Sequence, residues 1–233
     1  MFSQTARYYD KIYAFKDYQA EAQRLVALIG QYLGSGGNRL LDVACGTGQH
    51  IVHMKAHFEV EGLDLSPEFL EIARQRNPGV PLHHADMVDF CLGRLFDVVT
   101  CLFSSIGYVK TVDNLARAAT CMADHLVPGG ILIIEPWFTP DDWHPNTVHG
   151  LFIDEPNLKI ARVNTSFVDG RLSYFDLHYL IGTPGGTEHL VERHELGLFE
   201  QEEMRAALEG TGLQVTYDEE GLMGRGLYIG RRL

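Results

Sequence analysis

The sequence predicts an α/β protein with a doubly wound, mostly parallel, seven-stranded Rossmann-like sheet and a small inserted antiparallel β subdomain. Apolar, strand-like runs alternate with helical patterns over the first 137 residues, and this alternation is typical of a parallel sheet with helices on both faces. After residue 137 the segments lack helical spacing and are bounded by Asp-Gly and Gly-Gly turn signals, which are typical of antiparallel strands. A length of 233 residues suits one such domain with an insert.

The elements of the first half follow from apolar spacing and from helix-capping residues. A helix is expected where apolar side chains recur every three or four residues, and Ser66 is expected to cap the helix that begins at Pro67. The expected helices cover residues 17–33, 49–58, 67–77 and 111–126, and the expected strands cover residues 39–44, 60–66, 81–87, 95–107 and 131–137.

The second half is expected to form a three-stranded antiparallel meander before it returns to the main sheet. Its strands are expected at 159–170, 171–182 and 188–199, followed by a helix at 200–210 and two strands at 213–219 and 226–232. We therefore expect a cofactor-binding core with an N-terminal helical lid over residues 1–137. An inserted meander over 138–197 would serve as a substrate cap or dimer element, and residues 198–233 would complete the core sheet.

Composition narrows the class of partner. The net charge of −12 repels phosphate backbones and anionic membranes, so we expect neither nucleic acid nor membrane as a partner. A cationic ligand is tolerated. The apolar runs are too short to span a bilayer, the first residues lack the pattern of an export signal, and the four cysteines contain no C-x-x-C pair. These features predict a cytoplasmic protein with reduced thiols.

A glycine-rich turn follows the first expected strand. In the stretch "LLDVACGTG", Asp42 ends the strand, and Ala44, Gly46 and Gly48 lie in the turn that leads into a helix. Glycine permits positive φ and lets the backbone approach a ligand without a Cβ in the way. Such turns also occur for structural reasons alone, but a position between strand and helix favours a nucleoside cofactor.

Acidic residues also end the second and third expected strands. Asp64 lies about 20 residues beyond the glycines, the position of a ribose-binding acid. The alternative is that Asp64 only caps the helix after Ser66. Asp86 is expected to accept from an adenine amino group, with Met87 against the ring. Together with Asp42, three acids end three consecutive strands at one edge of the sheet.

Two cofactors suit such a site. A dinucleotide normally requires G-x-G-x-x-G, and this chain has Ile51 where the third glycine would fall. S-adenosylmethionine (SAM) requires no phosphate site and carries a sulfonium and an ammonium, which an acidic turn suits. The sequence therefore favours SAM, with a nicotinamide-dependent oxidoreductase as the rival.

Several motifs carry a family resemblance. "LLDVACGTG", "GLDLS", "HHADMVDF", "FDVVTCLFSSIGY" and "HLVPGGILIIEPW" together resemble a class I SAM-dependent methyltransferase. "YYDKIY", "KDY", "EPWF", "ARV" and "GRGLYIG" are similar to the N,N-dimethyltransferases that act on nucleotide-linked 3-amino deoxysugars, the desosamine and mycaminose type. The chain departs from that pattern at Phe138, where a second Trp is usual, and lacks a Gly-Lys-Gly stretch before "KDY". Because of these departures, the sequence does not identify which sugar is the substrate.

The resemblance implies roles for particular residues of this chain. Cofactor contacts are implied for Tyr9, Tyr18, Asp42, Ala44, Gly46, Gly48, Asp64, Leu65, Asp86, Met87 and Leu102. Substrate contacts are implied for Trp137, Arg162, His178 and Arg225. It also implies a homodimer, in which the meander pairs across a twofold axis.

Methyl transfer is an in-line displacement that depends mainly on positioning and on the exclusion of water. Tyr108, just past the fourth expected strand, is the candidate catalytic residue that orients the amine; otherwise it is a packing aromatic.

Arg162 and Arg225 stand out in an acidic chain as partners for a nucleotide diphosphate; otherwise they form surface ion pairs. Aromatic faces from Tyr9, Tyr18 and Trp137 can stabilise the sulfonium; otherwise they are packing aromatics.

The sequence thus predicts a methyltransferase that moves methyl from SAM to a small molecule, most specifically to the amine of a nucleotide-linked aminosugar. No histidine pattern supports a metal site. Three rivals stay open: a methyltransferase of DNA, RNA, protein or another small molecule, a nicotinamide oxidoreductase, and a non-catalytic module that keeps the fold.

Overall fold

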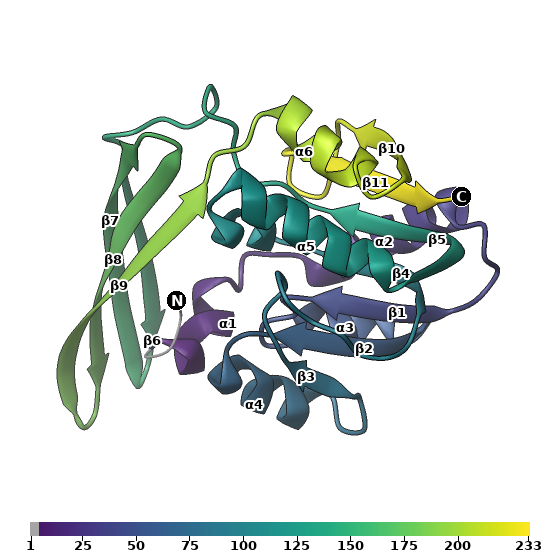
Figure 1. The fold of residues 1–233 in the computed structure, drawn as a ribbon. Helices are drawn as coiled ribbons and strands as arrows, with labels where there is room; N and C mark the ends of the chain where they lie inside the picture. Colours follow the sequence, from purple (N-terminus) through teal and green to yellow (C-terminus); the bar gives the residue numbers. More distant parts are fainter. Residues whose placement is uncertain (1–4) are drawn as a thin grey trace.

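A computed structural model describes residues 5–233 and confirms the predicted α/β fold with its mostly parallel sheet (Figure 1). The first four residues of the expected 1–137 segment lie outside the described residues. The seven strands run in the order β10-β11-β5-β4-β1-β2-β3, and β11 is antiparallel to both of its neighbours. Their bounds are β1 (Arg39–Val43), β2 (Glu59–Asp64), β3 (Leu82–His84), β4 (Phe96–Cys101), β5 (Leu126–Ile134), β10 (Leu213–Asp218) and β11 (Leu227–Arg232).

Helices cover both faces of this sheet, as Figure 1 shows. Their bounds are η1 (Ala6–Tyr8), α1 (Tyr9–Ile12), α2 (Tyr18–Tyr32), α3 (Gln49–Met54), α4 (Pro67–Arg76), η2 (Ser105–Val109), α5 (Val112–Asp124) and α6 (Gln201–Glu209). Ser66 caps α4 as expected, because its hydroxyl accepts from the Phe69 N–H at 3.2 Å. The helix expected over 49–58 ends earlier, at Met54. None of the helices in residues 5–233 has the length and hydrophobicity needed to cross a bilayer.

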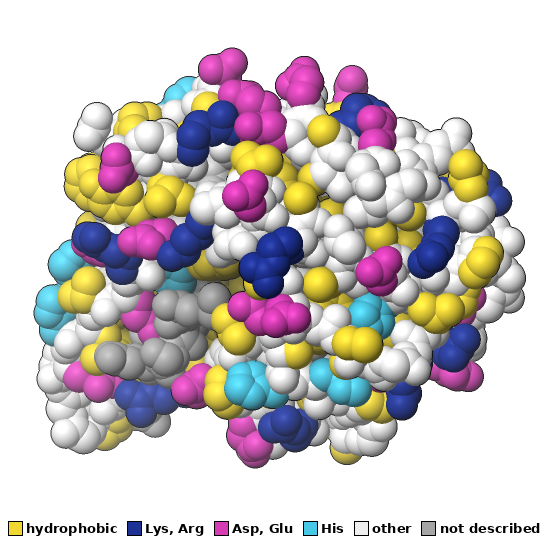
Figure 2. All heavy atoms as spheres, viewed as in Figure 1, with side chains coloured by type: hydrophobic (Ala, Val, Ile, Leu, Met, Phe, Trp, Pro, Cys, Tyr) yellow, Lys and Arg dark blue, Asp and Glu magenta, His cyan; other side chains and the backbone are white. Residues whose placement is uncertain are grey.

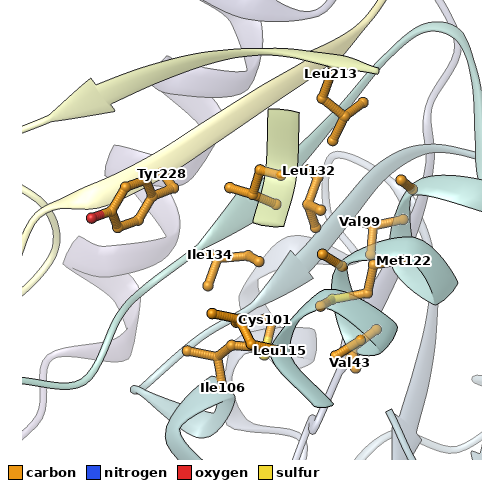
Figure 3. Packing of buried hydrophobic residues seen from close by; sticks show 14 of the residues in the cluster. Val43, Val99, Cys101, Ile106, Leu115, Met122, Leu132, Ile134, Leu213 and Tyr228 are labelled. Carbon is orange, nitrogen blue, oxygen red and sulfur yellow. The ribbon is translucent and has the colours of Figure 1, made fainter. Parts of the chain in front are cut away.

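The core lies on both faces of the main sheet because its central strands are buried on both sides. Alternate residues of one strand enter different clusters: Leu41 packs under α5 and α6, whereas Leu40 packs under α2 and α3. Figure 3 shows the first cluster, in which Val99, Leu132 and Ile134 of the sheet meet side chains of α5 and α6. This double layer fixes the carboxyl ends of β1, β2 and β4 side by side.

A second sheet stands apart from the main one, on the left in Figure 1. It has four antiparallel strands in sequential order: β6 (Val148–Glu155), β7 (Leu158–Asp169), β8 (Leu172–Thr183) and β9 (Gly186–Gly197). The expectation of three strands was wrong, because β6 was missed. As an edge strand with no fully buried residue, β6 carries little hydrophobic alternation that a sequence could reveal. The role of residues 138–197 as a cap or dimer element stays a prediction.

Candidate active site

A cavity of about 740 Å³ lies between the carboxyl edge of the main sheet and one face of the second sheet. Its walls come from α1, the turns after β1, β2 and β3, η2, and the buried face of β7–β9. The structure brings eleven of the predicted site residues to this cavity: Tyr9, Ala44, Gly46, Asp64, Leu65, Asp86, Met87, Tyr108, Trp137, Arg162 and Arg225.

Asp64 organises the edge of the sheet at the glycine turn. Its Oδ2 accepts from the Gly46 N–H and its Oδ1 from the Ser66 N–H, both at 2.8 Å. Burial raises the pKa of Asp64, although these backbone donors act in the opposite direction. Asp64 therefore bonds to the start of α4, as the helix-capping alternative expected. Each carboxylate oxygen, however, can accept more than one hydrogen bond. The side chain lines the cavity and can still accept from two hydroxyls of a ligand.

In the glycine turn, Gly48 is required by packing, whereas Ala44 and Gly46 line the cavity. Gly48 has a φ of +75°, and a Cβ there would lie 2.6 Å from Asn77 Nδ2, so this position requires glycine. Ala44 also has a positive φ, of 57°. Ala44 and Gly46 face the cavity, whereas Gly48 packs against α4.

Asp86 and Met87 follow β3 and line the same end of the cavity, next to Leu65. Asp86 Oδ1 accepts from the Val88 N–H at 3.1 Å, which leaves acceptor positions on the carboxylate for a ligand. An amino group of an aromatic base is the kind of donor that this carboxylate suits.

Three predicted cofactor residues lie behind the cavity wall. Asp42 is buried and accepts from Thr100 Oγ1 at 2.8 Å, and burial raises the pKa of this carboxyl to about 6. Leu102 packs in the core on the α2–α3 face. Tyr18 contacts His50 edge to face, with ring centroids 5.0 Å apart. These positions support the wall rather than form it.

An ionic cluster ties the N-terminal helix to the glycine turn. The Asp10 carboxylate of α1 accepts from Thr47 Oγ1 at 2.7 Å and forms an ion pair with Arg76 of α4. The Arg76 guanidinium also donates to the Thr47 carbonyl. We call Asp10, Thr47 and Arg76 the α1 latch. It holds α1, and with it Tyr9, over the cavity, a feature that the sequence motifs did not predict.

Aromatic rings form the wall between α1 and the main sheet. Tyr9 contacts Tyr13 and Phe69, with ring centroids at 4.6 Å and 4.9 Å, and Tyr13 contacts Phe103 edge to face at 5.3 Å. Sequence analysis did not single out Tyr13, although it lies four residues after Tyr9, where a helix places side chains on one face. Such a wall excludes water and stabilises a cation.

Tyr108 lies on η2, against the inner face of the second sheet. Its Oη is 2.7 Å from Nδ1 of His194, a residue of β9 that sequence analysis missed. Both side chains line the cavity. The alternation of β9, in which Glu192, His194 and Leu196 face inward, is the signal that could have found His194.

Two arginines line the cavity, Arg225 beside Trp137 and Arg162 beside Tyr13. Arg225 donates to the fully buried Glu135 carboxylate at 3.3 Å, and its Cζ lies 5.9 Å from the Trp137 ring centroid. Arg162 Nη1 is 3.5 Å from Tyr13 Oη. The Nε atoms of both arginines are buried and have no hydrogen-bond partner within residues 5–233. Buried unpaired donors beside a cavity indicate an anionic ligand.

His178 does not reach the cavity. It lies on the opposite face of β8, exposed, and stacks on His189 with ring centroids 5.5 Å apart. Strand alternation explains this, because the neighbouring Leu177 and Tyr179 face the interior. Within the described part of the chain, no group of three or more His, Cys, Asp and Glu side chains is arranged to hold a metal ion.

Comparisons with known proteins decide the family. Residues 40–130 match a family described as a methyltransferase domain. The chain is 41% identical over 217 residues to dTDP-3-amino-3,6-dideoxy-alpha-D-glucopyranose N,N-dimethyltransferase of Streptomyces fradiae, covering 92% of this chain and 85% of that one. The chain belongs to the class I S-adenosylmethionine-dependent methyltransferase family.

Solved structures of this methyltransferase family share the whole fold. DesVI of Streptomyces venezuelae superimposes with a TM-score of 0.93 and 38% identity over 100% of both chains. CalS10, an amino pentose methyltransferase from Micromonospora echinaspora solved with bound SAM, gives a TM-score of 0.88 and 36% identity, covering 100% of this chain and 98% of that one. This methyltransferase uses SAM as its cofactor, and the nicotinamide and non-catalytic alternatives are thereby set aside.

Proposed function

We propose that this methyltransferase transfers methyl from SAM to the amino group of a nucleotide-linked aminosugar. One observation carries the proposal: a single cavity joins the acidic edge of the main sheet, where Asp64 and Asp86 lie, to two arginines with buried, unpaired Nε atoms. The carboxylates suit a nucleoside with a cationic tail, whereas the two arginines suit a diphosphate. The Streptomyces fradiae relative is named for a dTDP-linked aminosugar and CalS10 for an amino pentose, and both names support the same substrate class.

The residues present fit SAM at the acidic end. Asp64 would accept from the ribose hydroxyls, Asp86 from the adenine amino group, and Met87 and Leu65 would pack against the ring. Ala44 and Gly46 line the cavity with their backbone. A Cβ on Gly46 would meet no protein atom within 4 Å, so the space beside this backbone is open to the ligand. Bound SAM supplies an electrophilic methyl group on a sulfonium.

The remaining residues would prepare the acceptor. The ring wall of Tyr9, Tyr13 and Phe103 would exclude water and stabilise positive charge by about 1 kcal/mol per well-placed ring. Tyr108 would orient the amine, so that the nitrogen lone pair points along the line of displacement. Arg162 and Arg225 would bind the nucleotide phosphates, and Trp137 would pack beside them.

We further propose that two copies associate through the second sheet. Its outer face carries Phe152, Val163, Leu180 and Val191, all exposed; Leu180 is 54% and Phe152 75% accessible. The register of β6–β9 places these four side chains on one face, opposite the buried Ile160 and Tyr179. We call this group the outer apolar face. Exposed apolar side chains that gather on one face of a sheet are typical of an interaction site.

Charge and thiols support a small-molecule enzyme of the cytoplasm. Figure 2 shows acidic and basic side chains interspersed on the viewed face, and the net charge is −12, which disfavours nucleic acid as a substrate. The four cysteines are free thiols, and Cys91 is exposed, as suits a reducing compartment.

The test is methyl transfer to a panel of acceptors. Nucleotide-linked 3-amino and 4-amino deoxysugars, the same sugars without nucleotide, and a nucleotide-linked sugar with a hydroxyl in place of the amine are each incubated with SAM, and products are read by mass spectrometry. We expect methylation of nucleotide-linked amines alone. Methylation that ignores the nucleotide, or that occurs on RNA or protein, would contradict the proposal.

A further inference from the structure

The contact between Tyr108 and His194 is built by close packing of η2 on β9. Gly107 precedes Tyr108, and a Cβ at Gly107 would lie 3.0 Å from Leu196 Cδ2 and 3.1 Å from Trp137 Cβ. A glycine here lets η2 approach β9 closely. This approach brings the phenol oxygen of Tyr108 to 2.7 Å from His194 Nδ1.

The imidazole of His194 is held in one orientation. It is 1% exposed and stacks on Phe175, its partner in the β8–β9 register, with ring centroids 5.6 Å apart and planes 17° apart. The Tyr108 ring meets it at an angle of 63°. A ring that is fixed in this way presents Nδ1 to a single point in the cavity wall.

Both members of the pair are uncharged near neutral pH. Burial is the main cause that lowers the pKa of His194 to about 3, and the positive charge of Arg162 acts in the same direction. Burial also raises the pKa of Tyr108 well above its usual range. The contact is therefore a hydrogen bond between a phenol and a neutral imidazole, and His194 is a poor general base.

The direction of this hydrogen bond follows from chemistry and distance. A phenol is a stronger acid than a neutral imidazole N–H, so the phenol is the better donor. A separation of 2.7 Å is usual for a hydroxyl donor and shorter than the usual 2.9 to 3.0 Å of an N–H donor. Tyr108 has one O–H with which to donate, and His194 Nδ1 accepts this hydrogen bond.

We propose that His194 is a positioning residue: its Nδ1 accepts a hydrogen bond from the Tyr108 hydroxyl, so that the Tyr108 oxygen offers only acceptor lone pairs to the substrate amine. The inference rests on the proposed function. The amine would donate one N–H to Tyr108 Oη, and this bond would fix the rotation of the nitrogen and aim its lone pair at the methyl group. His194 itself does not contact the reacting atoms.

The number of N–H groups that remain on the amine then determines how many methyl groups are added. In each transfer the amine lone pair forms the new N–C bond, while the C–S bond breaks and leaves its electron pair on sulfur. The resulting ammonium loses a proton to water, because neither Tyr108 nor His194 accepts it. A primary and a monomethylated amine keep an N–H for Tyr108, whereas the dimethylated amine has none. The site thus holds two successive acceptors and releases the third species.

The first test reads the tautomer of His194 without turnover. Protein labelled with nitrogen-15 histidine is examined by long-range proton–nitrogen correlation, and the His194 signals are assigned by their loss in His194→Asn. We expect Nδ1 to be unprotonated and hydrogen-bonded, and its shift to move in Tyr108→Phe. A protonated Nδ1, or a shift that Tyr108→Phe leaves unchanged, would overturn the inference while leaving the proposed function intact.

The second test measures coupling between the two residues. We expect His194→Ala to lower kcat for the primary amine about tenfold, the value of one neutral hydrogen bond, with the KM for SAM unchanged. In Tyr108→Phe, the same change should have little further effect. His194→Asn should recover most of the activity, because its Oδ1 can accept at the Nδ1 position.

Two results would count against the coupling. Equal losses from His194→Ala in the wild-type and Tyr108→Phe backgrounds would show that His194 acts independently of Tyr108. Full activity in His194→Ala would show that the tyrosine needs no partner. The exposed His189→Ala serves as the matched control and should leave kcat unchanged. If the wild type methylates none of the nucleotide-linked amines, the proposed function fails and this inference fails with it.

Discussion

Asp64 Oδ2 accepts a hydrogen bond from the backbone N–H of Gly46 at 2.8 Å, and this bond ties the end of β2 to the turn after β1. The same carboxylate accepts from the Ser66 N–H at the start of α4. One buried side chain therefore sets the relative position of the turn and the helix, and it does so at the wall of the cavity. We propose that ribose binding and the local fold share this carboxylate.

The α1 latch predicts that cofactor binding depends on a residue outside the cavity. Arg76→Ala removes the ion pair with Asp10 and the bond to the Thr47 carbonyl, so α1 loses its hold on the glycine turn. We expect the affinity for S-adenosylhomocysteine to fall about tenfold, by isothermal titration calorimetry, as for the loss of a charge-assisted hydrogen bond. Arg74→Ala on the same helix is the control, because Arg74 makes only an exposed pair with Glu71 at 3.7 Å. Equal affinities of the two variants would refute the latch.

The buried Asp42 predicts a pH dependence of stability. Its pKa is raised to about 6 from an ordinary 3.8, so the folded state binds more protons than the unfolded state between these values. The free energy of unfolding should therefore fall as pH rises from about 4 to about 6. A pKa difference of this size between the folded and the unfolded state corresponds to a change of about 3 kcal/mol in the free energy of unfolding.

Asp42→Asn should reduce this fall, to which the raised pKa of Asp64 also contributes, while keeping an acceptor for Thr100 Oγ1. Urea unfolding at pH 4.5 and 7.5, in the absence of ligand, measures the difference in the free energy of unfolding between the two pH values. Asp154→Asn is the control, because the Asp154 side chain is 83% exposed. A variant whose stability still falls over this range as that of the wild type does would show that Asp42 is not the group that titrates.

The arginine pair predicts which part of the substrate is recognised. Arg225→Lys keeps a positive charge near the buried Glu135 but loses the planar group over Trp137 and the paired N–H donors. We expect the KM for the nucleotide-linked aminosugar to rise about tenfold and the affinity for S-adenosylhomocysteine to stay unchanged. Arg205→Lys, at an exposed ion pair with Glu209, is the control. A KM that does not change, or the same change for a sugar without nucleotide, would separate Arg225 from the phosphates.

The outer apolar face predicts self-association. Leu180→Glu introduces a charge at its centre, and we expect sedimentation velocity to show a monomer where the wild type is a dimer. Val112→Glu on α5 is the control, because Val112 is also exposed but lies on a different surface. If both variants sediment as the wild type does, the second sheet is not the interface.

Much of the fold could be predicted because its signals are local. The central strands β1 and β4 are mostly apolar, and Ser66 followed by Pro67 marks the start of α4. The strand β6 has no buried residue and lacks such a signal, and it was missed for this reason. The acids that follow the strands could also be placed at one edge, because parallel strands end together.

The contacts that complete the site depend on pairs far apart in the chain. His194 reaches Tyr108 across 86 residues, and Asp10 reaches Arg76 across 66. The packing of separate elements against one another decides these contacts. Along β8 itself, alternation separates the outward His178 from the inward Leu177. Sequence spacing within one element cannot fix register between elements.

Binding of S-adenosylhomocysteine to Asp64→Ala and Asp64→Asn, measured by calorimetry, tests the central claim most directly. The analogue that lacks the ribose hydroxyls serves as a matched ligand, and thermal unfolding checks that each variant is folded. The wild type should bind S-adenosylhomocysteine about a hundredfold more tightly than Asp64→Ala does, as expected for two bonds to a carboxylate, and the two proteins should bind the analogue alike. A folded Asp64→Ala protein with wild-type affinity for S-adenosylhomocysteine would contradict the account, because the ribose would then lie elsewhere.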